Sequence, residues 1–196
     1  MKKVIIEKTL YQFHELSETA KEKAIKDYLN DNDDLTYQFS DMVVEELKYL
    51  YGLKNLKTYY SLSYCQGDGL CLSGYITPEE IFDNENFSSI ALAGIDPKDI
   101  EIAKADYITV KFDHKGRYYY ANSVDIDFDY SDYHSDETER IMYAIIENIK
   151  KWYFDVCAKF EKTGYSFFYE MENDDFQEMA ECNDWWFDEN GKLSFE

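Results

Sequence analysis

The residues best suited to chemistry in this sequence are the aspartates of the segment D-I-D-F-D-Y-S-D, residues 125–132. In an extended strand, Asp125, Asp127 and Asp129 project from one face, while the apolar residues between them face the core. Carboxylates would then repeat about every 6.7 Å, twice the rise of a strand residue. Like charges at that spacing repel one another, so the pattern predicts a positive partner on this face.

Calcium is one candidate for that partner, because D-x-D-x-D also opens the calcium loop of an EF-hand. Counted from Asp125, the sixth position is Tyr130, where the loop requires glycine, and the twelfth is Asp136, where glutamate is expected. No metal or other cofactor is therefore expected. Two interpretations remain: a basic protein surface bound by the strand, with Asp132 and Asp136 extending the contact, or a solvated edge strand whose charge prevents aggregation.

A second acidic cluster is a further candidate for the partner-binding surface. It consists of Glu170, Glu172, Asp174, Asp175, Glu178 and Glu181. Whether it extends the surface of the acidic strand depends on the fold. The 19 tyrosines, 13 phenylalanines and three tryptophans could supply contact anchors, since tyrosine buries a large area at a small entropic cost, although most are expected in the core.

Signatures of catalysis are sparse. His14, His114 and His134 are far apart in sequence, and no nucleophile elbow, P-loop, HExxH or paired Cys/His motif occurs. Arg117, followed by three tyrosines, is the only combination of basic and aromatic residues that suits nucleic acid. The chain is expected to be a binding protein and not an enzyme; a metal-dependent nuclease built from the aspartates is the alternative.

The charge of the chain restricts its partners. Twenty lysines and arginines against 41 aspartates and glutamates give a net charge of −21, and residues 121–196 contain 6 basic and 20 acidic side chains. Such an excess repels nucleic acids and anionic membranes, so the expected partner is a basic, nucleic-acid-binding protein, with no direct contact to nucleic acid or membrane. A generally acidic soluble protein is the simpler interpretation.

Length and hydrophobic content suit one domain over residues 1–196, with a subdivision near 77–105 as the alternative. The apolar run near the start is interrupted at Glu7 and Lys8, so neither a signal peptide nor a membrane span is expected and the protein should be cytoplasmic. The four cysteines form no CxxC pair and are expected to be reduced.

Helical and hairpin patterns alternate without regular βαβ units, which predicts an α+β fold with an antiparallel sheet covered by helices. The clearest local signals are a hairpin over residues 56–76 and a capping box at Thr77–Glu80. Apolar residues at steps of three and four predict a long helix from about 135 to 162, stopped at Gly164. A strand over residues 165–172 should follow it.

Two segments carry a resemblance to known proteins. Phe13–Ala24 reads F-x-E-L-S-x-x-A-K-x-x-A and Tyr60–Gly69 reads Y-S-x-S-Y-x-Q-G-D-G. Together they resemble small proteins of phages and mobile elements, some labelled antitoxin-like, over about residues 10–76. Part of the second match is turn chemistry, because Asp-Gly suits a tight hairpin. With the acidic C-terminal half and the absence of enzyme motifs, the chain looks like anti-CRISPR proteins of Gram-positive phages, which inhibit Cas9.

The resemblance implies a counter-defence protein in the host bacterial cytoplasm that binds Cas9 or its guide RNA complex and blocks DNA binding. Cas9 holds nucleic acid in positively charged channels and reads the PAM with arginines, so an acidic surface that mimics nucleic acid could replace phosphates there. Two alternatives stay open: an antitoxin-like protein that neutralises a basic toxin, and an enzyme that degrades guide RNA.

Overall fold

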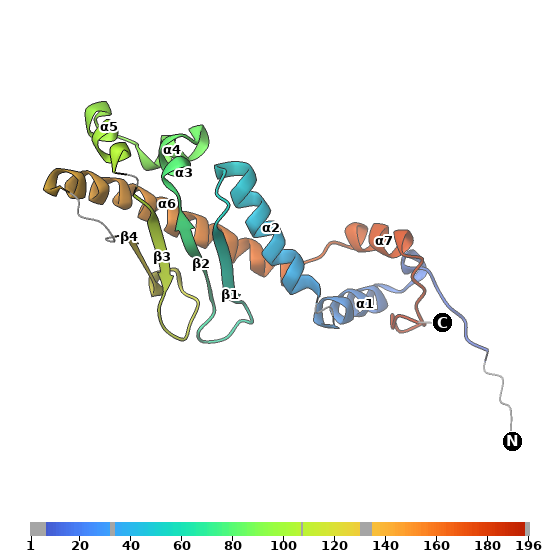
Figure 1. Cartoon of the computed structure of the whole chain (residues 1–196). Helices are drawn as coiled ribbons and strands as arrows, with labels where there is room; N and C mark the ends of the chain where they lie inside the picture. Colours follow the sequence, from blue (N-terminus) through green and yellow to red (C-terminus); the bar gives the residue numbers. More distant parts are fainter. Residues whose placement is uncertain (1–6, 32–33, 107, 130–134, 195–196) are drawn as a thin grey trace, which may run out of the picture. The chain divides into compact units, whose positions relative to one another are not determined.

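The structure, a computed structural model, describes residues 7–31, 34–106, 108–129 and 135–194. Within them the predicted α+β class is confirmed: seven α-helices accompany one antiparallel sheet of four strands (Figure 1). The chain divides into two compact units, of which unit 1 comprises residues 1–35 and 166–196 and unit 2 comprises residues 36–165. That residues 1–196 fold as one domain stays a prediction. No helix among the described residues is long and apolar enough to cross a membrane.

Unit 2 is built on the sheet, in which each strand pairs antiparallel with the next along the chain. The strands are β1 (Leu56–Ser61), β2 (Gly69–Ile76), β3 (Val110–His114) and β4 (Val124–Phe128). The predicted hairpin over residues 56–76 is confirmed as β1 and β2. Because successive strand residues face opposite sides, residues such as Leu72, Phe112 and Ile126 are buried on one face. Tyr59 and Tyr75 are exposed on the other.

Two long helices, α2 (Asp34–Tyr51) and α6 (Asp136–Tyr169), belong largely to unit 2, and Figure 1 shows α6 crossing behind the four strands. Tyr153 fixes α6 to the sheet, because its hydroxyl donates to the carbonyl of Leu72 at 3.1 Å and accepts from the backbone N–H of the same residue at 3.2 Å. Burial raises the pKa of Tyr153 far above its usual value, so the hydroxyl stays neutral and keeps this double contact.

Three short helices lie between β2 and β3: α3 (Pro78–Phe82), α4 (Glu85–Ala91) and α5 (Pro97–Ala105). The predicted capping box starts α3: Thr77 Oγ1 accepts from the Glu80 backbone N–H at 3.3 Å, and the Glu80 carboxylate accepts from the Thr77 N–H at 2.8 Å. The same carboxylate also accepts from the Lys54 N–H at 2.9 Å, which ties α3 to the chain ahead of β1.

The end of the long helix differs from the prediction. α6 continues through Gly164 to Tyr169, so the strand predicted over residues 165–172 does not form. A Cβ atom at Gly164 would lie 2.4 Å from Leu62 Cδ1 and 2.8 Å from Phe39 Cζ. The glycine therefore permits close packing of α6 inside unit 2, and it does not terminate the helix.

Unit 1 contains α1 (Glu18–Asp31), α7 (Asn173–Cys182) and a short 3-10 helix at Phe13–Glu15. Its core contains three packed phenylalanines, with the Phe13 ring 4.7 Å from that of Phe176 and 6.1 Å from that of Phe187. Phe187 also exchanges two backbone hydrogen bonds of 2.9 Å with Tyr11. Contacts between aromatic rings thus contribute to the packing of unit 1.

Candidate functional site

The predicted acidic strand corresponds to β4. Asp125 and Asp127 are exposed on its outer face, and Ile126 and Phe128 are buried on the other. The Asp127 carboxylate accepts a hydrogen bond of 2.9 Å from the backbone N–H of Phe128. β4 is an edge strand of the sheet, with β3 as its neighbour on one side. The alternation expected from the sequence is thus present over this strand.

Two lysines, one on β3 and one directly after it, form ion pairs with Asp129 and Asp125. The Lys111 ammonium lies 2.7 Å from Asp129, and Lys115 forms an ion pair with Asp125. These hydrogen bonds raise the pKa of both lysines. In the sheet register Lys111 lies opposite Asp127 and Asp113 lies opposite Asp125, so the outer face of β3 and β4 carries charges of both signs. Because the chain supplies its own cations here, self-repulsion no longer argues for an outside positive partner on this strand.

The remaining aspartates of this predicted site do not enlarge it. Asp132 lies outside the described residues. Asp136 is the first residue of α6, where a carboxylate is stabilised by the helix dipole, which is a structural reason for its presence. An open pocket beside β4 is lined by Lys150 of α6 in addition to Lys111 and Lys115, so its charge is mixed.

The second acidic cluster is exposed along α7 in unit 1, whereas β4 belongs to unit 2. Glu172 precedes the helix, and Asp174 and Asp175 occupy its first turn, where the helix dipole stabilises them. Among the described residues, no lysine, arginine or histidine nitrogen lies within 4 Å of the carboxylates of Glu170, Glu172, Asp174 or Asp175. None of the described cationic groups therefore neutralises these four carboxylates directly.

Among the residues that the structure describes, the histidines are not brought together. His14 lies in unit 1 at 4.0 Å from Glu181, and Nε2 of His114 in unit 2 lies 3.0 Å from the Tyr118 carbonyl oxygen. His134 lies outside the described residues. Over the part of the chain that the structure describes, no three His, Cys, Asp or Glu side chains are arranged to hold a metal ion.

A different set of side chains meets at one end of the sheet. Figure 1 shows the loop between β1 and β2 beside the loop that follows β3. The two loops touch: a Cβ atom at Gly67 would lie 2.7 Å from the Tyr118 ring, and one at Gly69 would lie 3.0 Å from the Tyr119 carbonyl oxygen. Residues 62–69 and 115–120 are termed the hairpin end below.

Asp68 organises the first loop of the hairpin end. Its carboxylate accepts the backbone N–H groups of Ser63 and Cys65 at 2.6 and 3.0 Å, and the O–H of Tyr165 on α6 at 3.0 Å. The hydroxyls of Ser61 and Ser63 each lie at 3.2 Å. Partial burial opposes the charged form, but these hydrogen bonds outweigh it and hold the pKa of Asp68 far below its usual value. The loop is therefore fixed around one carboxylate.

The fixed loop presents Tyr64 to solvent. Tyr64 has a φ of 55°, a left-handed conformation that is uncommon for residues other than glycine and costs backbone strain. Its side chain is 69% exposed, with the ring 4.7 Å from that of Tyr165. A strained backbone around an exposed aromatic ring is typical of a binding position, because the surrounding hydrogen bonds must maintain it.

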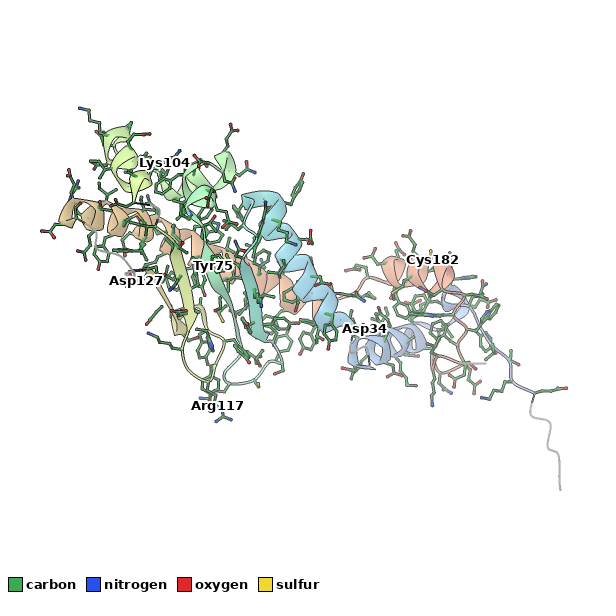
Figure 2. The ribbon with its side chains drawn as sticks, viewed as in Figure 1. Asp34, Tyr75, Lys104, Arg117, Asp127 and Cys182 are labelled. Atoms are coloured by element: carbon green, nitrogen blue, oxygen red, sulfur yellow. The ribbon has the colours of Figure 1, made fainter. Side chains whose placement is uncertain are left out.

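The second loop adds further exposed rings. Tyr118 and Tyr120 are exposed, their ring centroids 5.7 Å apart, and the Arg117 guanidinium carbon lies 5.8 Å from the Tyr118 ring. Figure 2 shows Arg117 at the tip of this end of the sheet. On β1, Tyr59 is also exposed and stacks 6.1 Å from Tyr119. Tyrosine and arginine are the residue types that most often dominate the binding energy of protein interfaces.

The sequence interpretation missed the role of Asp68, treating it only as part of a turn. One signal was available: Asp68 is the only charged residue between Lys57 and Glu79. A lone carboxylate among serines and tyrosines favours a hydrogen-bonding role. Its partner Tyr165 is 97 positions away in the chain, so that contact requires the fold.

We expect Asp68→Asn to lower the free energy of unfolding by about 1–2 kcal/mol at neutral pH, because hydrogen bonds to a charged acceptor are lost at a partly exposed site. The folded pKa of Asp68 lies below its ordinary value of 3.8, so its stabilisation is present above that value and disappears as the pH falls through the folded pKa. Urea unfolding of both proteins should give a difference that is constant from neutral pH to about pH 5 and shrinks below pH 4. A difference independent of pH would contradict this role of the carboxylate.

The chain belongs to the family described as Domain of unknown function (DUF8835), which matches residues 39–166. That range contains nearly all of unit 2, with the sheet and the hairpin end, and it does not contain α7. No curated protein and no solved structure matches the chain. The family description names no activity.

Proposed function

We propose that the chain is a non-catalytic binding protein that docks through the hairpin end on a basic, nucleic-acid-binding protein. The observation that carries this proposal is the cluster of exposed tyrosines and Arg117 on two touching loops, of which the loop with Tyr64 is held by the Asp68 hydrogen bonds. Rings that are already ordered lose little conformational entropy on binding, so more of their contact energy appears as affinity.

Charge supports the choice of a basic partner. Unit 1 contains 18 acidic and 7 basic side chains within 66 residues, and no positively charged group of the chain lies within 4 Å of the Glu172, Asp174 or Asp175 carboxylates among the described residues. The negative electrostatic field of these side chains raises the association rate of a basic partner. It contributes less to the lifetime of the complex. In this division of roles, the tyrosines supply the affinity and the carboxylates supply the steering.

Cas9 loaded with its guide RNA is the first partner to test, because of the resemblance of residues 10–76 to phage and mobile-element proteins. Its positively charged nucleic-acid channels match the charge of this chain. The proposed role is then counter-defence in a bacterial host, by obstruction of DNA binding. A basic ribonuclease toxin is the partner expected for the antitoxin-like alternative.

The test is a titration of the full chain against the Cas9–guide RNA complex at about 0.1 M and about 0.5 M salt, between which the screening length falls about twofold. We expect binding with an association rate that decreases at the higher salt and with guide RNA that stays intact on a denaturing gel. The same titration against a basic ribonuclease tests the alternative. Binding to neither protein, or cleavage of the guide RNA, would contradict the proposed function.

Two matched variants, each lacking three negative charges, separate steering from contact. One carries Glu172→Gln, Asp174→Asn and Asp175→Asn on α7, and the other carries Asp125→Asn, Asp127→Asn and Asp129→Asn at β4. If the carboxylates only steer, both variants should slow association by similar factors and leave dissociation unchanged. Faster dissociation in the β4 variant alone would place β4 in the interface and contradict this division of roles.

A further inference from the structure

Unit 1 contains an open pocket of about 580 Å³ between α1, α7 and the chain that follows α7. Its inner part is lined by Ala24, Phe176 and Phe187, which are almost fully buried. Tyr28 and Trp185 are half-buried and line its outer part, with ring centroids 5.6 Å apart and planes inclined by 49°. The Phe176 ring lies 5.6 Å from Tyr28 and 6.0 Å from Trp185, so the three rings pack against one another and form an aromatic wall of the pocket.

Charged side chains complete this pocket. Asp27 and Asp34 line it, together with one cation, Lys192. Asp188 lies close to that lysine: backbone N–H groups of Lys192 and Asn190 donate to its carboxylate, and these hydrogen bonds, with the nearby positive charges, lower the pKa of Asp188. The positive charge of Lys192 thus has a carboxylate nearby, outside the pocket, while Asp27 and Asp34 line the pocket together with four aromatic side chains.

The Asp27 carboxylate is only loosely engaged inside the chain. Its nearest cation is Lys23, one helical turn away, at 3.8 Å, and both side chains are 48% exposed. An ion pair of this length between exposed groups contributes little, so an incoming cation can compete with Lys23 for the carboxylate.

We propose that this pocket binds a single cationic side chain, lysine or arginine, of a partner protein. The aromatic faces attract a cation through their quadrupoles, the apolar lining accepts the methylene stem, and the carboxylate of Asp27 pairs with the charged head. A neutral chain of the same length would gain only the apolar contacts. The negative field of unit 1 disfavours an anionic occupant. This pocket belongs to unit 1 and the hairpin end belongs to unit 2.

The pocket can be tested on the full chain with small probes, so the result is independent of the docking proposed above. The readout is the indole N–H signals of Trp152, Trp185 and Trp186 in nitrogen–proton NMR spectra. The probes are N-acetyl-lysine amide and N-acetyl-arginine amide, with N-acetyl-norleucine amide as the uncharged control and sodium chloride as the ionic-strength control. We expect a saturable shift of the Trp185 signal with either cationic probe, with a dissociation constant on the order of millimolar.

Two substitutions beside the pocket should act in opposite directions. Asp27→Asn removes the paired carboxylate and should weaken binding of the cationic probes by about two- to fivefold. Lys23→Gln removes the internal competitor and should strengthen binding. Equal shifts with the norleucine probe, equal shifts of all three indole signals, or an affinity unchanged by Asp27→Asn would each overturn the proposal.

Discussion

Changing Tyr64 and Tyr118 together to serine is expected to weaken binding of the chain to the Cas9–guide RNA complex by about 100-fold or more. Buried tyrosine anchors at the centre of an interface typically contribute about 2 kcal/mol or more each when truncated. Tyr64 is 69% and Tyr118 45% exposed in the free chain, so the double variant should remain folded, and its free energy of unfolding is measured beside its affinity.

The control for this double variant is Tyr37→Ser with Tyr49→Ser. These two tyrosines of α2 are 73% and 83% exposed, but they lie outside the hairpin end. Both variants remove two exposed rings from unit 2, so a difference between them reports where the rings lie. Calorimetric titration should show the loss of affinity in the hairpin-end variant and not in the α2 variant. If the α2 variant loses as much affinity as the hairpin-end variant, the tyrosines of the hairpin end are not the anchors.

Changing Gly164 to alanine is expected to destabilise unit 2 by about 1–3 kcal/mol, the usual cost of inserting a methyl group into a packed site. Elsewhere in a helix interior the same change stabilises by up to about 1 kcal/mol, so the sign of the effect is diagnostic. The added Cβ atom would meet Leu62 Cδ1 and Phe39 Cζ at distances far below van der Waals contact. Leu62 is the first residue of the loop that Asp68 holds in place, so a shift of Leu62 should also disturb the hairpin end.

Denaturant unfolding measures this effect, with Thr163→Ala as the neighbouring control on α6. Thr163 is partly exposed and its hydroxyl donates to the Lys159 carbonyl within the helix, so its removal should change stability by less than about 0.5 kcal/mol. A Gly164→Ala protein as stable as the wild type would show that the helix can move away at this point, and that the close approach is not required.

Local signals predicted much of the fold. The capping box at Thr77, the hairpin over residues 56–76 and the apolar stripe of the long helix all act within a few residues, and the structure contains each of them. The strand predicted over residues 165–172 was wrong because Gly164 was interpreted through its local propensity. Its actual role depends on Phe39, 125 positions away in the chain, and no local pattern reveals that contact.

The candidate site was predictable only in part, for the same reason. Strand periodicity placed Asp125 and Asp127 on one exposed face, but the lysines that pair with the acidic segment are Lys111 on β3 and Lys115 directly after it, and the sheet register decides which charges meet. Arg117 and the following tyrosines were recognised as an unusual combination. Their assembly with Asp68 requires two loops that only the sheet brings together.

Amide hydrogen exchange of the chain, free and bound to the Cas9–guide RNA complex, tests the central claim most directly. The hairpin end should gain the largest protection on binding, because docking there excludes water from both of its loops. The amides of α7 should change little, since steering charges need no close contact. If residues 62–69 and 115–120 exchange in the complex as they do in the free chain, while protection appears on β4 or α7, the hairpin end is not the docking surface.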